Sequence, residues 1–333
     1  MKAVQLYAKG DLRVEEVEAP DAIASDEVLL SVEAAGICGS DLHNFHTGVW
    51  ISRSPSIPGH EFCARVLEVG ERVTTLQPGD RVVADSRVSC GDCDACNSEQ
   101  RYLCAGMGFV GEVNNGGFAP YTVQKASQLL KLPSSDLPAM IAVFAEPLAV
   151  ALHAVNRVNP RKNDRALIVG AGTIGVLCAI VLQHRGVDVV QVAELNELRR
   201  NHVCEKFGLT AFELTKNTIP NRQRPTLCID STGSAAVVDR VLGNLSRGGR
   251  LSIVGLYRDN VSIDMNAVVE GGITLCGCAA FDNELHESVS LLPELKDEIM
   301  KIAVQKINIE SVPGWYDILS KGDSPMQKVI VQH

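Results

Sequence analysis

Hydrophobic and polar residues alternate in short runs over roughly the first 140 residues of the chain. Alternation with a period of two is typical of half-buried β-strands. Pro78 and Gly79 stand together between two such runs and indicate a turn. We therefore expect an antiparallel β domain here. Its clearest predicted strands lie within 27–37, 63–73, 79–88 and 120–132.

From about residue 147 the pattern changes to apolar positions at helical spacing, interrupted by short apolar runs. Such alternation of strand and helix predicts a parallel, doubly wound sheet, so the fold class is α/β. Helices are expected at 148–158, within 170–186, at 196–208 and at 234–245. Strands are expected at 165–169, 187–194, 226–230 and 249–256. The final run, 328–333, reads as a closing strand that returns to the first domain.

Length and charge limit the function. A chain of 333 residues is long enough for two domains. A net charge of −9 argues against a nucleic-acid partner, which needs clustered Lys and Arg. The N-terminal residues lack the apolar core of a secretory signal. The uncharged stretch 166–182 is shorter than the roughly 20 residues of a membrane span and carries three glycines. We expect a cytoplasmic protein without a membrane partner.

Four of the eleven cysteines are closely spaced in a polar stretch, as C-x2-C-x2-C-x7-C. An odd total without an export signal fits poorly with a disulfide framework. Four thiolates can enclose one Zn²⁺ as a structural site. The spacing also allows an iron–sulfur cluster, although it favours zinc. The four residues are Cys90, Cys93, Cys96 and Cys104.

A G-x-G-x-x-G motif lies between a predicted strand and a predicted helix, as expected for a dinucleotide pyrophosphate site. Glu194 ends the next predicted strand, where a carboxylate can accept hydrogen bonds from ribose hydroxyls and repel a 2′-phosphate. This favours NAD over NADP. Arg199 lies nearby and weakens that preference. The candidate cofactor residues are Gly170, Gly172, Thr173, Ile174, Gly175, Glu194 and Arg199.

Cysteine, histidine and carboxylate residues also occur in three separate segments, a combination that matches a catalytic zinc site with one open position. The first segment, GICGSDLH, contains Cys38, Ser40, Asp41 and His43. The second, PGHE, contains His60 and Glu61, and the third, AEPLAVALHA, contains Glu146 and His153.

These segments, the four-cysteine run, GGFAPY and GAGTIG occur in the order found in the zinc-dependent medium-chain dehydrogenase/reductase family, which the whole chain resembles. Within it the chain is most similar to the polyol and sugar-acid branch, the sorbitol and L-idonate dehydrogenase types. The resemblance implies a GroES-like catalytic domain over 1–146 and 280–333, with a structural zinc lobe at 88–106. It implies a Rossmann NAD-binding domain over 147–279, and a homo-oligomer, either a dimer or a tetramer.

The resemblance also implies roles for individual residues. Cys38 and His60 would be zinc ligands, and either Glu61 or Glu146 would be the third ligand. Asp41 would accept a hydrogen bond from His60. Ser40 would take the substrate proton and pass it toward His43 through the cofactor ribose. The implied reaction is hydride transfer between NAD and a secondary alcohol of a polyol or sugar acid, with zinc acidifying the hydroxyl.

Two departures from the branch affect substrate recognition. Ala280 stands where an arginine is expected, and Asn44-Phe45 replaces a tyrosine. These changes leave the reaction class unaffected but put sorbitol in doubt. A threonine-type dehydrogenase that oxidises an amino-acid alcohol is the first alternative. A non-catalytic zinc- and NAD-binding relative is the second.

Overall fold

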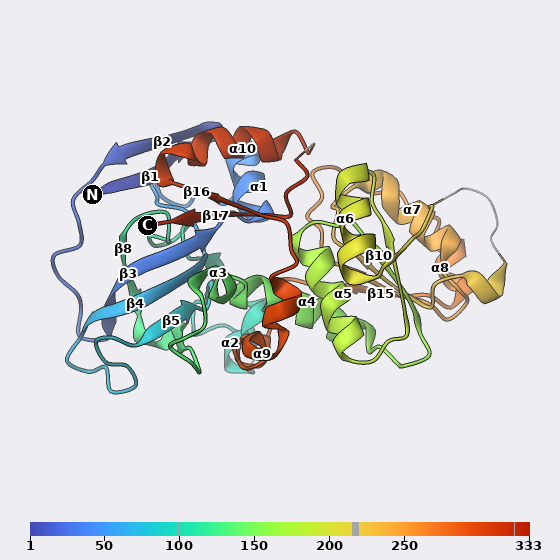
Figure 1. Cartoon of the computed structure of the whole chain (residues 1–333), viewed down its shortest axis with the longest axis horizontal. Coiled ribbons are helices and arrows are strands. Elements are labelled where there is room, and N and C mark those ends of the chain that lie inside the picture. Colours follow the sequence, from blue (N-terminus) through green and yellow to red (C-terminus); the bar gives the residue numbers. More distant parts are fainter. Residues whose placement is uncertain (99, 215–219, 323) are drawn as a thin grey trace.

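The computed structural model describes residues 1–98, 100–214, 220–322 and 324–333. Figure 1 shows two lobes side by side, with both chain termini in the first lobe and the helices α4 (Ala145–Val158) and α9 (Glu284–Ile299) near the junction. Each lobe is built on one large sheet.

The first lobe contains a sheet of seven strands in the order β16-β17-β3-β4-β5-β9, with β8 paired to β3. Burial alternates along β3, where Val28, Leu30 and Val32 are buried and the residues between them are half-buried. The period-two pattern therefore predicts the strand correctly. The strands are β3 (Glu27–Gly36), β4 (Glu61–Val69), β5 (Arg81–Ala84), β8 (Tyr121–Lys125), β9 (Leu129–Lys131), β16 (Val304–Ile307) and β17 (Lys328–Gln332).

The closing strand β17 pairs antiparallel with β3, with Ile330 opposite Gly36. This confirms that the chain returns to the first lobe after building the second. The same lobe also carries a β-hairpin, one short strand pair and several helices. They are β1 (Lys2–Ala8), β2 (Asp11–Glu16), α1 (Gly39–Thr47), β6 (Arg87–Val88), α2 (Asp94–Asn97), β7 (Gly108–Phe109), α3 (Ala139–Ala142) and α10 (Val312–Ser320).

The second lobe contains a six-stranded sheet in the order β12-β11-β10-β13-β14-β15, and every pairing in it is parallel. The predicted doubly wound architecture is therefore confirmed. The strands are β10 (Arg165–Val169), β11 (Val189–Ala193), β12 (Thr210–Ala211), β13 (Leu227–Asp230), β14 (Arg250–Ile253) and β15 (Thr274–Gly277). The helices are α5 (Thr173–His184), α6 (Glu197–Phe207), α7 (Ala235–Asn244) and α8 (Met265–Gly271).

Helix α4 joins the lobes, and the predicted domain boundary after residue 146 falls inside its first turn. In the described part of the chain, the stretch Ala139–Val158 is the one helical segment long and apolar enough to cross a membrane, but 78% of its most apolar 18-residue window is buried inside the protein. Its apolar residues pack with α5 and α9 in a core shared by both lobes. The hydrophobicity of α4 is thus explained by core packing.

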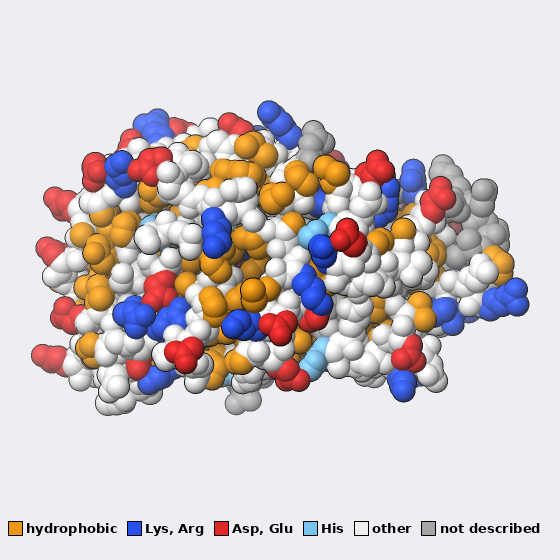
Figure 2. Space-filling view, in the orientation of Figure 1, with side chains coloured by type: hydrophobic (Ala, Val, Ile, Leu, Met, Phe, Trp, Pro, Cys, Tyr) orange, Lys and Arg blue, Asp and Glu red, His pale blue; other side chains and the backbone are white. Residues whose placement is uncertain are grey.

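Charged side chains are mixed on the face shown in Figure 2, where Lys and Arg stand among acidic and neutral residues without forming a continuous basic patch. This face offers no surface of the kind that binds a phosphate backbone.

Candidate active site

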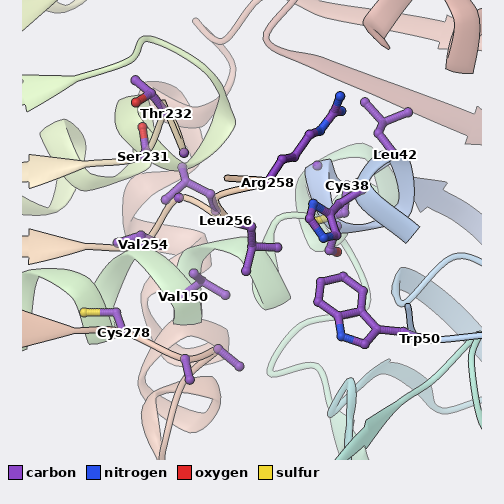
Figure 3. A pocket seen from close by; sticks show the side chains of 18 of the residues that line it. Cys38, Leu42, Trp50, Val150, Ser231, Thr232, Val254, Leu256, Arg258 and Cys278 are labelled. Atoms are coloured by element: carbon purple, nitrogen blue, oxygen red, sulfur yellow. The ribbon is translucent and has the colours of Figure 1, made fainter. Parts of the chain in front are cut away.

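A cavity of about 860 Å³ lies between the lobes and is lined by residues of both. In Figure 3, Cys38, Leu42 and Trp50 of the first lobe face Ser231, Thr232, Val254 and Leu256 of the second. The space is large enough for a nicotinamide ring together with a small substrate. Of the predicted site residues, Cys38, Ser40, His43, His60, Glu146 and Ile174 line it.

The pairing of β3 with β4 brings three predicted metal ligands together. Gly36, at the end of β3, lies opposite Glu61, at the start of β4. Cys38 follows β3 as the N-cap of α1, and His60 directly precedes β4. The ligand atoms of Cys38, His60 and Glu61 all lie within 4.8 Å of one another. A thiolate, an imidazole and a carboxylate at these separations fit a divalent zinc ion.

His60 is buried and held from both sides of its ring. Its Nδ1 lies 3.6 Å from Asp41 Oδ1, while its Nε2 lies 3.4 Å from Ser40 Oγ. Asp41 Oδ2 also accepts a hydrogen bond of 2.8 Å from the Cys38 backbone amide. Burial raises the pKa of Asp41, opposed by the charge of His60. Asp41 therefore links the two loops and lies beside the imidazole, but at 3.6 Å the contact is longer than the hydrogen bond that the sequence predicted.

Glu61 forms an ion pair with Lys328, and both side chains are 1% exposed. Lys328 also donates a 3.1 Å hydrogen bond to the Ile37 carbonyl oxygen. A Cβ atom at Gly36 would collide with both the Glu61 carboxylate and the Lys328 side chain. Glycine at position 36 is therefore required for this pair to form beside the predicted ligands.

Glu146 lies in the first turn of α4, where its Oε1 accepts a 2.7 Å hydrogen bond from Ser86 Oγ. Burial raises the pKa of Glu146 to about 7, and the charge of His60 opposes that shift. Glu146 is not among the three residues whose ligand atoms converge. It lines the cavity beside them, where it can reach a bound water or substrate hydroxyl.

His43 and Trp50 form one wall of the cavity, with ring centroids 4.9 Å apart. Burial lowers the pKa of His43, and the nearby Arg258 charge lowers it further. Asn44, at the position of the missing tyrosine, is buried and its Oδ1 accepts a 3.0 Å hydrogen bond from the Trp50 amide. Asn44 thus holds the backbone of Trp50, whose indole lines the cavity.

His153 does not belong to this site. It is buried on α4, where its Nδ1 lies 3.0 Å from Glu284 Oε1 and its ring contacts Tyr102. This side chain therefore connects α4 both to α9 and to the segment 90–104 that carries the four cysteines. Its grouping with the metal-ligand candidates in the sequence is therefore wrong.

The four cysteines at 90–104 converge on one point, with all four sulfur atoms within 4.8 Å of one another. Three sulfur pairs are 3.4, 3.6 and 3.9 Å apart. A tetrahedron of Zn–S bonds has sulfur–sulfur edges of about 3.8 Å. Backbone amides of Cys96 and Ala105 lower the pKa of Cys93 to about 6, which favours the thiolate that a metal binds. The geometry fits one zinc ion.

The glycine-rich loop has the shape that the motif predicts. Gly170 has a φ of +92°, and a Cβ at Gly175 would collide with the Gly170 carbonyl oxygen. A Cβ at Gly172, by contrast, would meet nothing within 4 Å. Packing therefore requires glycine at 170 and 175 but leaves open space over Gly172, at the N-terminus of α5. That space suits a pyrophosphate.

Glu194 folds back onto this loop, and its carboxylate accepts 2.7 Å hydrogen bonds from the amides of Ala171 and Asn196. Arg199 points away from it, because its guanidinium donates to the carbonyl oxygens of Ser324 at 2.7 Å and Gly322 at 2.9 Å. Arg199 therefore connects the lobes in this structure, a role that the sequence did not reveal.

Thr173 is also engaged by the closing segment, since its hydroxyl donates to the Gln327 carbonyl oxygen. Gln327 in turn donates a 3.1 Å hydrogen bond to the Ala171 carbonyl oxygen. The residue after it, Lys328, reaches the metal-ligand cluster. Two adjacent residues thus contact both the predicted cofactor loop and the predicted metal site.

The sequence analysis did not single out Ser86, Glu112 or Lys328, whose side chains lie at the site. Ser86 and Glu112 lie in segments with no ligand spacing, so no local signal marks them. Lys328 precedes the apolar run Val329–Val331, and a charged residue there could have suggested a buried ion pair.

Known proteins share this architecture. Residues 24–134 match the alcohol dehydrogenase GroES-like domain. The sorbitol dehydrogenase of Bacillus subtilis is 30% identical over 306 residues, covering 88% of this chain and 86% of that protein. The L-threonine 3-dehydrogenase of Idiomarina loihiensis is 28% identical over 340 residues, covering 97% and 98% respectively.

Among solved structures, an alcohol dehydrogenase of Escherichia coli in complex with NADH superimposes with a TM-score of 0.90 at 25% identity. The match covers 100% of this chain and 99% of that one. Full-length similarity in sequence and structure agrees with the order of motifs and with the two-lobed fold. The chain therefore belongs to the zinc-dependent medium-chain dehydrogenase/reductase family, as its motifs predicted.

Proposed function

We propose that the protein is a zinc-dependent, NAD-linked dehydrogenase that interconverts a secondary alcohol of a polyol or sugar acid and the corresponding ketone. The observation that carries the proposal is the convergence of Cys38, His60 and Glu61 in the cavity between the lobes. The glycine-rich loop at the entrance to the second lobe would hold the dinucleotide. With both bound, such a cavity would hold an alcohol carbon beside a nicotinamide ring.

Cys38, His60 and Glu61 would hold the catalytic zinc, which when bound lowers the pKa of the substrate hydroxyl. Asp41 keeps the His60 ring oriented. Ser40 Oγ, on the cavity wall beside His60, would accept the hydroxyl proton and pass its own proton toward His43 through the cofactor ribose. Glu146, held by Ser86, would orient a water or hydroxyl opposite them.

NAD is the proposed cofactor, and Glu194 is the residue proposed to select it. We expect wild-type enzyme to prefer NAD to NADP by at least roughly tenfold in kcat/KM, because a carboxylate repels the 2′-phosphate. The variant Glu194→Gln removes the charge at nearly constant size and should narrow that ratio. Steady-state kinetics with both cofactors measures it, and a wild-type preference for NADP would place Glu194 away from the ribose.

A structural zinc ion is proposed for Cys90, Cys93, Cys96 and Cys104. Together with the catalytic site this predicts about two zinc ions per chain. Elemental analysis of the purified protein after exhaustive dialysis checks the number. A value of one would mean that one of the two sites has been misassigned, and iron in place of zinc would restore the cluster interpretation of the four cysteines.

Two alternative functions can be tested with the same purified protein. Similarity to a threonine dehydrogenase keeps an amino-acid alcohol as an alternative substrate. A non-catalytic zinc- and NAD-binding relative would show both ligands bound but no NADH formed with any alcohol. A panel of polyols, aldonates and L-threonine, followed by NADH absorbance, separates these possibilities. By family membership we also propose a cytoplasmic homo-oligomer, a dimer or tetramer.

A further inference from the structure

Glu112 is a charged group in the cavity that the proposed reaction does not use. It lies on the cavity wall together with His60, Phe109 and Trp50, on the side formed by the first lobe. The residue as a whole is half-buried. Among the residues that the structure describes, no Lys, Arg or His nitrogen lies within 4.0 Å of that carboxylate. The protein thus presents a carboxylate without a cationic partner to whatever enters the cavity.

The loop around Glu112 holds it in place. The Glu112 amide donates a 2.9 Å hydrogen bond to the Phe109 carbonyl oxygen, and its own carbonyl oxygen accepts one of 3.0 Å from Ser52 Oγ. The preceding Gly111 has a φ of +90°, and its amide donates to Asn114. Both ends of the turn are therefore hydrogen-bonded, so the backbone that carries Glu112 is held in place at the cavity wall.

The electrostatic surroundings of Glu112 are mixed. Burial raises its pKa to about 7, the Asp41 charge adds to this shift, and the His60 charge together with the Phe109 amide opposes it. A divalent cation held by the nearby ligands would favour the ionised form. Arg258, the cationic lining residue, lies near His43 and His46 on the opposite side of Cys38 from Trp50 in Figure 3.

We propose that Glu112 determines substrate specificity by accepting hydrogen bonds from the hydroxyls of an uncharged polyol and by repelling substrates that carry a carboxylate. This inference rests on the proposed function and narrows its substrate to the polyol side. Carboxylates are strong hydrogen-bond acceptors for hydroxyl groups. A like charge in a half-buried cavity costs affinity that a neutral substrate does not lose.

Matched pairs of substrates test the inference on the zinc-loaded enzyme with NAD. Glucitol and gluconate, xylitol and xylonate, and threitol and threonate each differ only in whether one terminal carbon is a hydroxymethyl or a carboxylate. We expect wild-type enzyme to prefer the polyol of the best pair by roughly tenfold or more in kcat/KM. Glu112→Gln should reduce that preference about tenfold, mainly through a lower KM for the aldonate.

Glu71→Gln is the control. This exposed glutamate follows the C-terminal end of β4 and does not line the cavity. It should leave the ratio unchanged. Two results would overturn the inference and leave the dehydrogenase proposal intact. One is a wild-type preference for aldonates or for L-threonine. The other is a polyol-to-aldonate ratio of kcat/KM that Glu112→Gln does not alter. Absence of turnover with every alcohol in protein that binds zinc and NAD would overturn both.

Discussion

Cys38→Ser is expected to abolish alcohol oxidation while the protein remains folded. Removing a hydrogen-bonding partner of a metal ligand typically costs about 10–100-fold, so loss of a thiolate ligand should cost more than about 100-fold in kcat. The zinc content should fall by about one ion per chain, because the four-cysteine site is untouched. Steady-state kinetics, elemental analysis and far-UV circular dichroism measure the three quantities.

Cys204→Ser is the matched control, since Cys204 lies half-buried on α6 and belongs to neither of the two candidate metal sites. It should retain both zinc ions and full activity. If Cys38→Ser kept its activity and its metal, Cys38 would not be a ligand, and the proposed mechanism would have to be abandoned.

Lys328→Met is expected to destabilise the first lobe strongly. The substitution keeps the long apolar chain but leaves the Glu61 carboxylate, 1% exposed, without its cation. Breaking a buried ion pair from one side typically costs about 3–5 kcal/mol in the free energy of unfolding. The loss should be largest in metal-free protein, because a cation bound by Cys38 and His60 would itself compensate the Glu61 charge. Urea unfolding with and without zinc measures both values.

The double variant Glu61→Gln with Lys328→Met should recover much of that loss in metal-free protein, because neither charge is then left alone. Lys301→Met serves as the control, since its ion pair with Glu298 is exposed and is worth only about 0.5 kcal/mol or less. If Lys328→Met and Lys301→Met lowered the free energy of unfolding equally, the buried Lys328–Glu61 pair would stabilise the fold no more than an exposed pair does.

The strands and helices of the second lobe were predicted well, because each carries its own local signal. Leu167 and Ile168 belong to a short apolar run, and the glycines after them mark the turn into α5. The parallel sheet follows from their alternation. The short edge strands β12 and β15 were not predicted, since a run of two to four residues has too few positions to show a period.

Within the site, Cys38, Ser40, His60 and Glu146 were candidates from motif spacing, and the structure places all of them on one cavity. His153 was grouped with them wrongly, because helical periodicity could not tell which side of α4 faces the metal. Glu112 and Lys328 were not found at all. They approach the site from a loop and from the last strand, and neither belongs to a motif that holds a predicted ligand of the catalytic site.

The sequence by itself therefore determined the family, the two-domain α/β architecture and the residue types of both proposed metal sites, because these depend on residue kinds at short, regular spacings. Only the tertiary structure decided which carboxylate lies beside Cys38 and His60, and which charged groups lie next to that carboxylate. Those relations depend on the register of β3 against β4 and β17, which brings Gly36, Glu61 and Lys328 into contact across nearly the whole length of the chain.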